Sequence, residues 1–185
     1  MEFTLYYRGE LKVNGKPKAK QELRRHFHSQ LKNLWSQMPL NEMNSFLDLN
    51  PEQGKISIIK TIGNFNFAPL VTEKLNLIAE LKITMLRPES PGSIITQSGD
   101  IDNRLKTLFD ALKIPKEPTA IPNNDNPSES ENPFFCLLED DSLITKVQVD
   151  TDRLLEECQN KSEVVLLIHV TTKTTRSSWD NIGFG

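Results

Sequence analysis

Alternating apolar and polar residues predict most of the strands in this chain. The clearest case runs from Leu75 to Met85, where every second residue is apolar until Arg87-Pro88 ends the pattern. Six strands are predicted by alternation or by a strongly apolar run: Glu2–Arg8, Lys55–Thr61, Gly63–Val71, Leu75–Met85, Leu143–Asp150 and Glu163–Thr172.

Apolar residues spaced by three or four predict two main helices. The first begins at Pro17, carries an apolar stripe from Leu23 to Met38, and ends at Pro39. The second covers Asp102–Lys113. Together with the strands, these helices predict an α+β fold in which a mixed β-sheet packs against two main helices.

The connecting segments divide the chain further. Residues Glu89–Gly99 are predicted to form a flexible loop, and Asp152–Cys158 one or two helical turns. Residues 114–133 contain five prolines among Asn, Ser and Glu, so they are predicted to be an insertion without a fold of its own. The expected organisation is one domain over 1–176 and a polar tail over 177–185.

In the first helix, Arg24, Arg25 and Lys32 lie largely off the apolar stripe and are expected at the surface. His28 is likewise expected to be a solvated residue. Phe27 and Trp35 are expected in the core rather than on a surface that stacks nucleic-acid bases.

Composition limits the protein class. The chain has 185 residues, 37% of them hydrophobic, which suits one soluble domain. Its longest apolar run, Val164–Ile168, is too short to span a bilayer, and Met1–Arg8 lacks the apolar core of a signal peptide. A cytoplasmic protein without membrane contact is expected. Cys136 and Cys158 form no CxxC pair, so a zinc cluster is not expected and at most one disulfide is possible.

Charge is distributed unevenly around a net value of −3. Residues 1–32 hold eight basic and three acidic side chains, whereas 117–145 hold seven acidic and no basic ones. A basic region can hold phosphates, and an acidic cluster can hold a metal ion. Ordinary solvated surfaces explain the same distribution.

The second helix carries the most informative polar residues. Asp102, Asn103, Lys106 and Asp110 are spaced to share one face, opposite the leucines, and Asp100 precedes them. Helix capping by the first two aspartates, and an ion pair between Asp102 and Lys106, are the structural alternatives to a catalytic role.

A second acidic pair, Asp140-Asp141, directly precedes a predicted strand. A turn before the strand explains this pair without any function. Two carboxylates about 4 Å apart repel by roughly 4 kcal/mol at an effective dielectric constant of 20. A fold tolerates such crowding when a divalent cation lies between the carboxylates or when water screens them.

Taken jointly, Asp-Ile-Asp-Asn, Lys106, Asp110-Ala-Leu and the later Asp-Asp pair resemble the RusA-like Holliday-junction resolvases over about residues 75–150. The resemblance implies a RusA-like α+β fold. It also implies metal binding by Asp100, Asp102 and Asp141. The resemblance further implies that Lys106 is catalytic together with these three aspartates, and that Asn103, Asp110 and Asp140 have supporting roles.

The implied activity is Mg²⁺-dependent, structure-selective cleavage of DNA that resolves four-way junctions during recombination and repair, in a protein of phage or prophage type. Mg²⁺ prefers oxygen ligands, and Mn²⁺ is a possible substitute. A metal-bound water would attack the phosphodiester in line while Lys106 stabilises the developing charge. Arg104, Arg24, Arg25 and Lys32 are the expected contacts to DNA phosphates, and the resemblance implies a homodimer.

Two other functions remain open. A non-catalytic module of the same fold could bind DNA or protein as an accessory factor, which the acidic balance and the long 114–133 segment favour. A related metal-dependent nuclease could act on RNA. The enzyme hypothesis requires Asp100, Asp102, Asp141 and Lys106 to converge in space.

Overall fold

A computed structural model describes residues 1–88, 100–157 and 163–184, with Asp100 described by its backbone only. The predicted loop Glu89–Gly99 and Cys158 lie outside the described residues. The α-helices and strands are β1 (Glu2–Glu10), α1 (Pro17–Trp35), β2 (Lys60–Ile62), β3 (Phe65–Val71), β4 (Leu77–Arg87), α3 (Asp100–Leu112), β5 (Phe134–Leu138), β6 (Ile144–Arg153) and β7 (Glu163–Thr174). Short 3-10 turns are η1 (Leu40–Leu47), η2 (Glu73–Leu75), η3 (Pro118–Ala120), η4 (Glu129–Glu131) and η5 (Asp141–Leu143).

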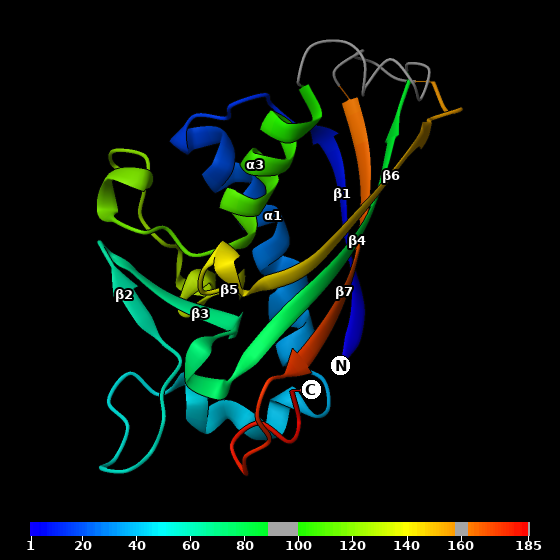
Figure 1. Ribbon diagram of the computed structural model, residues 1–185. Helices are drawn as coiled ribbons and strands as arrows, with labels where there is room; N and C mark the ends of the chain where they lie inside the picture. Colours follow the sequence, from blue (N-terminus) through cyan, green and yellow to red (C-terminus); the bar gives the residue numbers. More distant parts are fainter. Residues whose placement is uncertain (89–99, 158–162, 185) are drawn as a thin grey trace.

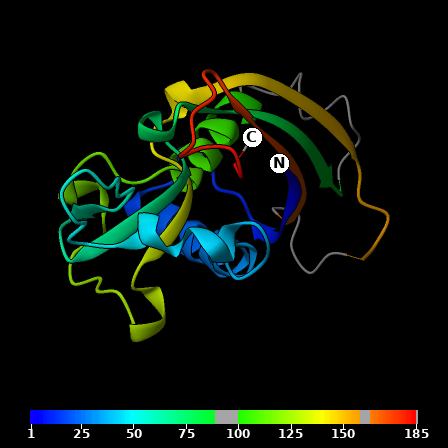
Figure 2. The same ribbon diagram turned by 90° about the horizontal axis from the view of Figure 1, so that it is seen from below.

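The strands form two mixed sheets, which confirms the predicted α+β class (Figure 1). In the larger sheet, of order β1-β7-β4-β6, β7 is antiparallel to both β1 and β4, whereas β6 is parallel to β4. The smaller sheet has the order β2-β3-β5, with β5 parallel to β3. The larger sheet curves, and α1 and α3 lie on its inner side (Figure 2).

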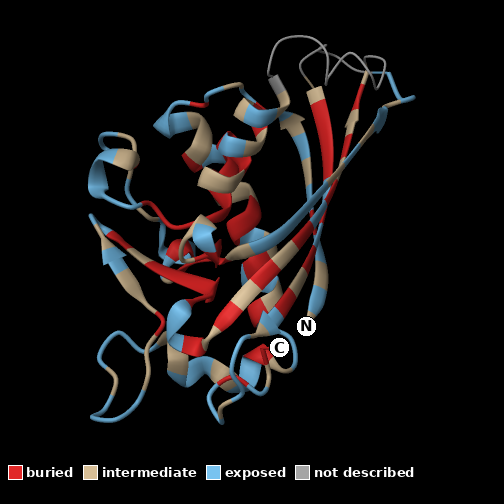
Figure 3. Cartoon of the chain, in the orientation of Figure 1, coloured by how far each residue is buried: buried red, intermediate tan, exposed pale blue. Residues whose placement is uncertain are grey.

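The predicted alternation in β4 is confirmed, since its residues alternate between buried and partly exposed (Figure 3). Strand β6 extends further than predicted. It pairs with β4 as far as Arg87 opposite Arg153, so the helical turns predicted from Asp152 are wrong over the paired residues. Pairing with a neighbouring strand overrides the weak local helix pattern there.

Strand β5 was not predicted. All five of its residues, from Phe134 to Leu138, are buried, because β5 lies between α1 and the core. A strand buried on both faces has no alternation to detect. Cys136 in this strand is a free, buried thiol whose pKa burial raises to about 12, so it is not a reactive nucleophile.

Helix α1 ends at Trp35, earlier than the predicted end before Pro39. The backbone N–H of Ser36 closes its last turn by donating to the carbonyl of Lys32 at 3.2 Å, and Met38 lies beyond it with 65% of its surface exposed. Phe27 and Trp35 are buried in the core, as predicted. None of the helices in the described part of the chain is long and apolar enough to cross a bilayer.

The C-terminal segment packs onto the domain. Phe184 is fully buried, with its ring 6.0 Å from that of Trp35 and 5.7 Å from that of Phe46. The Asn181 side chain donates a hydrogen bond to the carbonyl of Leu75 at 2.8 Å. These contacts attach residues of the predicted polar tail to the core.

Candidate functional site

Helix α3 carries most of the predicted site residues. Its inner side packs Leu108 and Leu112 into the core, so Asp102 and Lys106 are exposed on the opposite side. Their spacing of four places them on one helical face. Within the described residues Lys106 has no ion-pair partner, so the alternative explanation of Lys106 as a partner of Asp102 gains no support.

The C-terminal end of α3 places a buried lysine between two carboxylates. Lys113 Nζ lies 2.7 Å from Asp141 Oδ2 and 3.2 Å from Asp110 Oδ1. Lys20 of α1 adds a second cation, 2.6 Å from Asp110 Oδ2. Asp110 and Asp141 are thus brought together, and lysines balance their charge.

The pKa directions agree with this arrangement. Burial by itself would lower the pKa of Lys113, but hydrogen bonds and charge from Asp141 and Asp110 outweigh burial and raise it. Burial alone would raise the pKa of Asp110, but Lys20 and Lys113 outweigh it, and the pKa is lowered. Both groups therefore stay charged near neutral pH.

Asp140 begins the short turn η5. Its carboxylate accepts a hydrogen bond from the backbone N–H of Ser142 at 3.0 Å and lies 3.3 Å from Lys116 Nζ. The bond from Ser142 is the main cause that lowers the pKa of Asp140, and Lys116 adds to it. The predicted turn before the strand is therefore present, and Asp140 caps it.

Asp102 lies in the first turn of α3, whereas Asp141 is linked to the last turn through Lys113. Asp102 precedes Asp110 by about 12 Å along the helix axis, and Asp110 is joined to Asp141 through Lys113. The expected convergence of Asp102 with Asp141 is therefore not seen within one chain. Among the described side chains, which exclude that of Asp100, no group of three or more acidic, His or Cys residues is placed to hold a metal ion.

Two of the arginines expected to contact DNA are instead buried. Arg24 has 3% of its surface exposed; its guanidinium donates to the carbonyls of Asp110 at 2.7 Å and Lys113 at 3.1 Å. Arg104 has 8% of its surface exposed and donates to the carbonyl of Leu11. Neither side chain is therefore at the surface, where contact with a phosphate is expected, because each donates to backbone carbonyls.

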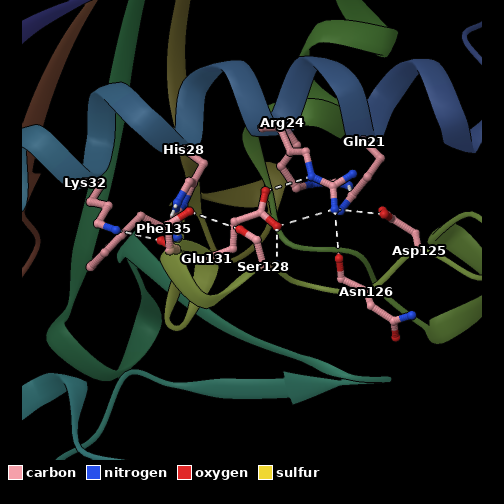
Figure 4. A network of polar contacts seen from close by, with 11 residues as sticks. Gln21, Arg24, His28, Lys32, Asp125, Asn126, Ser128, Glu131 and Phe135 are labelled. Atoms are coloured by element: carbon pink, nitrogen blue, oxygen red, sulfur yellow. Dashed lines mark hydrogen bonds and ion pairs between the residues drawn. The ribbon is translucent and has the colours of Figure 1, made fainter.

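The other two expected DNA contacts hold the 114–133 segment against α1 (Figure 4). Arg25 donates to Glu131 Oε1 at 2.7 Å and to Asp125 Oδ1 at 2.8 Å, and Lys32 Nζ donates to the carbonyl of Ser130 at 2.6 Å. The segment that the sequence predicted to lack a fold of its own is therefore attached to α1 by charge-assisted hydrogen bonds.

His28 is buried, which corrects the expectation of a solvated residue. Its Nδ1 accepts the backbone N–H of Phe135 at 2.8 Å, so the proton of the neutral ring is on Nε2, 3.4 Å from the carbonyl of Ser130 (Figure 4). Burial lowers the pKa of His28 below its ordinary 6.5. Protonation at Nδ1 would break the bond to β5.

This burial predicts a pH dependence of stability. The pKa of His28 is lower in the folded chain than in the unfolded chain. The contribution of neutral His28 to the free energy of unfolding is therefore complete above pH 6.5 and declines as the pH falls toward the folded pKa. The urea midpoint of the wild type should therefore fall between about pH 7.5 and about pH 5.5. In His28→Asn, whose amide oxygen can replace Nδ1 as acceptor, this part of the fall should disappear. An equally steep fall in the variant would contradict the assignment.

Two lysines that form ion pairs at the site, Lys113 and Lys20, were not predicted from the sequence. Lys113 follows Asp110 by three residues, a spacing that favours an ion pair on a helix and could have been noticed. Lys20 lies 90 residues before Asp110, so no local pattern connects them.

Comparison with known proteins yields no match: no family model fits the chain, and neither curated proteins nor solved structures include one that matches it.

Proposed function

We propose that this chain is a divalent-cation-dependent, structure-selective DNA endonuclease of the RusA-like kind that cleaves four-way or otherwise branched DNA. One spatial relation carries the proposal. Asp102 and Lys106 are exposed on α3, and the far end of the same helix meets Asp141 through Lys113. All the residues proposed for metal binding and catalysis therefore lie on one helix or at its end.

The donor atoms suit Mg²⁺ or Mn²⁺, since carboxylate oxygens are the ligands that hard cations prefer. Asp100, Asp102 and Asp141 are the proposed ligands. Within one chain, however, the described carboxylates do not form a complete set. Lys106 is exposed near Asp102 on the same face, where its ammonium group would stabilise negative charge on a phosphate being cleaved.

A homodimer would complete the set. Helix α3 has acidic groups at both ends, with Asp100 and Asp102 in the first turn and Asp141 beyond the last. If a two-fold axis aligns two copies of α3 in opposite directions, the first turn of one helix faces Asp141 of the partner subunit, and two equal sites result. A four-way junction has approximate two-fold symmetry, so two equal sites suit two opposed strands.

A second candidate function is a non-catalytic module that binds DNA or protein. The specific observation in its favour is that Lys113 already balances the charges of Asp110 and Asp141 without any metal ion. Such a module would fold and bind its partner equally well with and without Mg²⁺.

The test is cleavage of end-labelled synthetic four-way junction, matched duplex and matched RNA, with Mg²⁺, with Mn²⁺ and with EDTA. The expected result is paired nicks on opposed strands of the junction with either metal and none with EDTA. Cleavage of the duplex alone would show that the nuclease does not select junctions, and cleavage of RNA alone would show that its substrate is RNA. Binding of the junction without any cleavage would favour the accessory module.

A further inference from the structure

A basic cavity of about 520 Å³ lies where the loop after β1 leads into α1. Lys12, Lys16 and Lys18 line it, together with the backbone around Gly15 and one acidic residue, Glu22. Three positive charges against one negative charge leave an excess of two positive charges around the cavity. None of its lining residues is aromatic, so the cavity offers positive charge but no surface for stacking a base.

The lysine side chains of this cavity can bind a ligand, whereas Arg24, Arg25 and Lys20 of α1 already bind other parts of the chain. Lys16 and Lys18 are exposed, and neither has an ion-pair partner within the described residues. Lys12 is also exposed, with its ammonium group 3.7 Å from the Glu10 carboxylate, a distance typical of a weak surface pair.

The backbone adds to this positive potential. Helix α1 has no acidic residue in its first turn, and its N-cap residue, Lys16, makes no side-chain capping bond. The amide groups at the start of α1 therefore keep their partial positive charge beside the lysines.

The cavity is held next to α3. The backbone N–H of Gly15 donates to Thr107 Oγ1 at 2.8 Å, and a Cβ atom on Gly15 would lie only 2.7 Å from Thr107 Cγ2. One turn into α1, Lys20 pairs with Asp110 of α3 at 2.6 Å. These contacts attach the lysine loop to the middle and the end of the helix that carries Asp102 and Lys106.

We propose that this cavity binds a phosphate of the DNA backbone and thereby positions the substrate strand along α3. The inference rests on the proposed function and specifies how the substrate is held. Lysine ammonium groups and backbone amides recognise phosphate without reading bases, so the contact is independent of sequence. It differs from the phosphate contacts expected of Arg24, Arg25, Lys32 and Arg104, whose side chains hydrogen-bond to other parts of the chain.

The test measures binding separately from cleavage. Affinity of the purified full chain for a fluorescein-labelled four-way junction is measured by anisotropy in EDTA over a range of salt concentrations. In the triple variant K12Q/K16Q/K18Q the Kd should rise at least about tenfold. The slope of log K against log salt should become shallower by about 0.9 for each phosphate that the variant no longer neutralises.

Two matched variants complete the design. K55Q/K82Q/K146Q removes the same charge from exposed lysines elsewhere, and its Kd should stay within about twofold of the wild type. Glu22→Gln removes the one acidic group of the cavity, so it should tighten binding, an effect that misfolding cannot produce. Circular dichroism confirms folding of each variant.

Several outcomes would overturn the inference: equal weakening by both triple variants, wild-type affinity in the cavity variant, or no binding of DNA by the wild type. Calorimetric binding of inorganic phosphate that depends on the three lysines, without any effect on DNA, would identify a free anion as the ligand instead. If the cavity variant loses DNA affinity but the wild type cleaves nothing, the cavity is a phosphate-binding site in a protein that is not a nuclease.

Discussion

Asp102→Asn is expected to lower Mg²⁺-dependent cleavage of the junction by about a thousandfold. The substitution keeps the shape of the side chain and removes the charge that would hold the metal ion. A metal site contributes several kcal/mol to stabilising the transition state, and each 1.36 kcal/mol is about tenfold in rate. Asp102 is exposed, so the free energy of unfolding should change by less than about 0.5 kcal/mol. Single-turnover nicking and urea unfolding provide the two measurements.

Asp141→Asn should have a similar effect on cleavage, and mixing the two variants tests the homodimer. If each site takes Asp102 from one chain and Asp141 from the other, a mixed dimer retains one intact site. In the mixed dimer, roughly half of the wild-type sites should then be restored. Co-expression of the two variants with different tags, followed by a nicking assay of the doubly purified dimer, measures this restoration.

Each contrary result has a distinct meaning. Single variants that cleave as fast as the wild type would remove the proposed metal ligands and with them the nuclease assignment. Inactive single variants whose mixed dimer is also inactive would place the site within one chain. If Asp102→Asn no longer folds, the exposed side chain of Asp102 is required for folding.

Arg24→Met is expected to lower the free energy of unfolding by about 3 kcal/mol. The buried guanidinium of Arg24 donates to the carbonyls of Asp110 and Lys113, and also to the side-chain oxygen of Gln21. Methionine has a similar length but no donors, so these acceptors would stay buried and unpaired, at about 1–3 kcal/mol each. Relief of the burial of the charge offsets part of this loss.

Urea unfolding followed by tryptophan fluorescence provides the measurement, since Trp35 is buried. Lys18→Met is the control on the same helix, because Lys18 is exposed and its replacement should change stability by no more than about 0.5 kcal/mol. Arg24→Lys keeps the charge but has fewer donors in a different geometry. Its free energy of unfolding should lie between those of Lys18→Met and Arg24→Met. An unchanged urea midpoint in Arg24→Met would show that this network does not support the end of α3.

The hydrophobic pattern predicted the larger sheet well and the smaller sheet poorly. Strands β1, β4 and β7 each show local alternation or a strongly apolar run, and α1 and α3 show helical spacing. Strand β5 is short and buried throughout, so it shows no alternation of apolar and polar residues. Its parallel pairing with β3 defines it as a strand.

For the polar residues too, the sequence predicted what depends on neighbouring residues and not what depends on tertiary contacts. The sequence placed Asp102, Lys106 and Asp110 on one helical face, which is a local property of a helix. It could not show that Arg24 is buried or that Lys113 joins Asp110 to Asp141. Those facts depend on which surfaces meet, and a basic residue off the apolar stripe has the same local signature whether it contacts water or the end of another helix.

By itself, the sequence determined the α+β class, the two main helices and the spacing of the acidic residues on α3, because periodicity and spacing are properties of neighbouring residues. The tertiary structure alone decided that Arg24 supports α3, that Arg25 and Lys32 hold the 114–133 segment, and that Asp102 and Asp141 lie apart. These outcomes depend on contacts between residues far apart in the chain, such as Arg24 with Lys113, 89 residues later, and Arg25 with Glu131, 106 residues later. Burial and partner geometry exist only once the chain has folded.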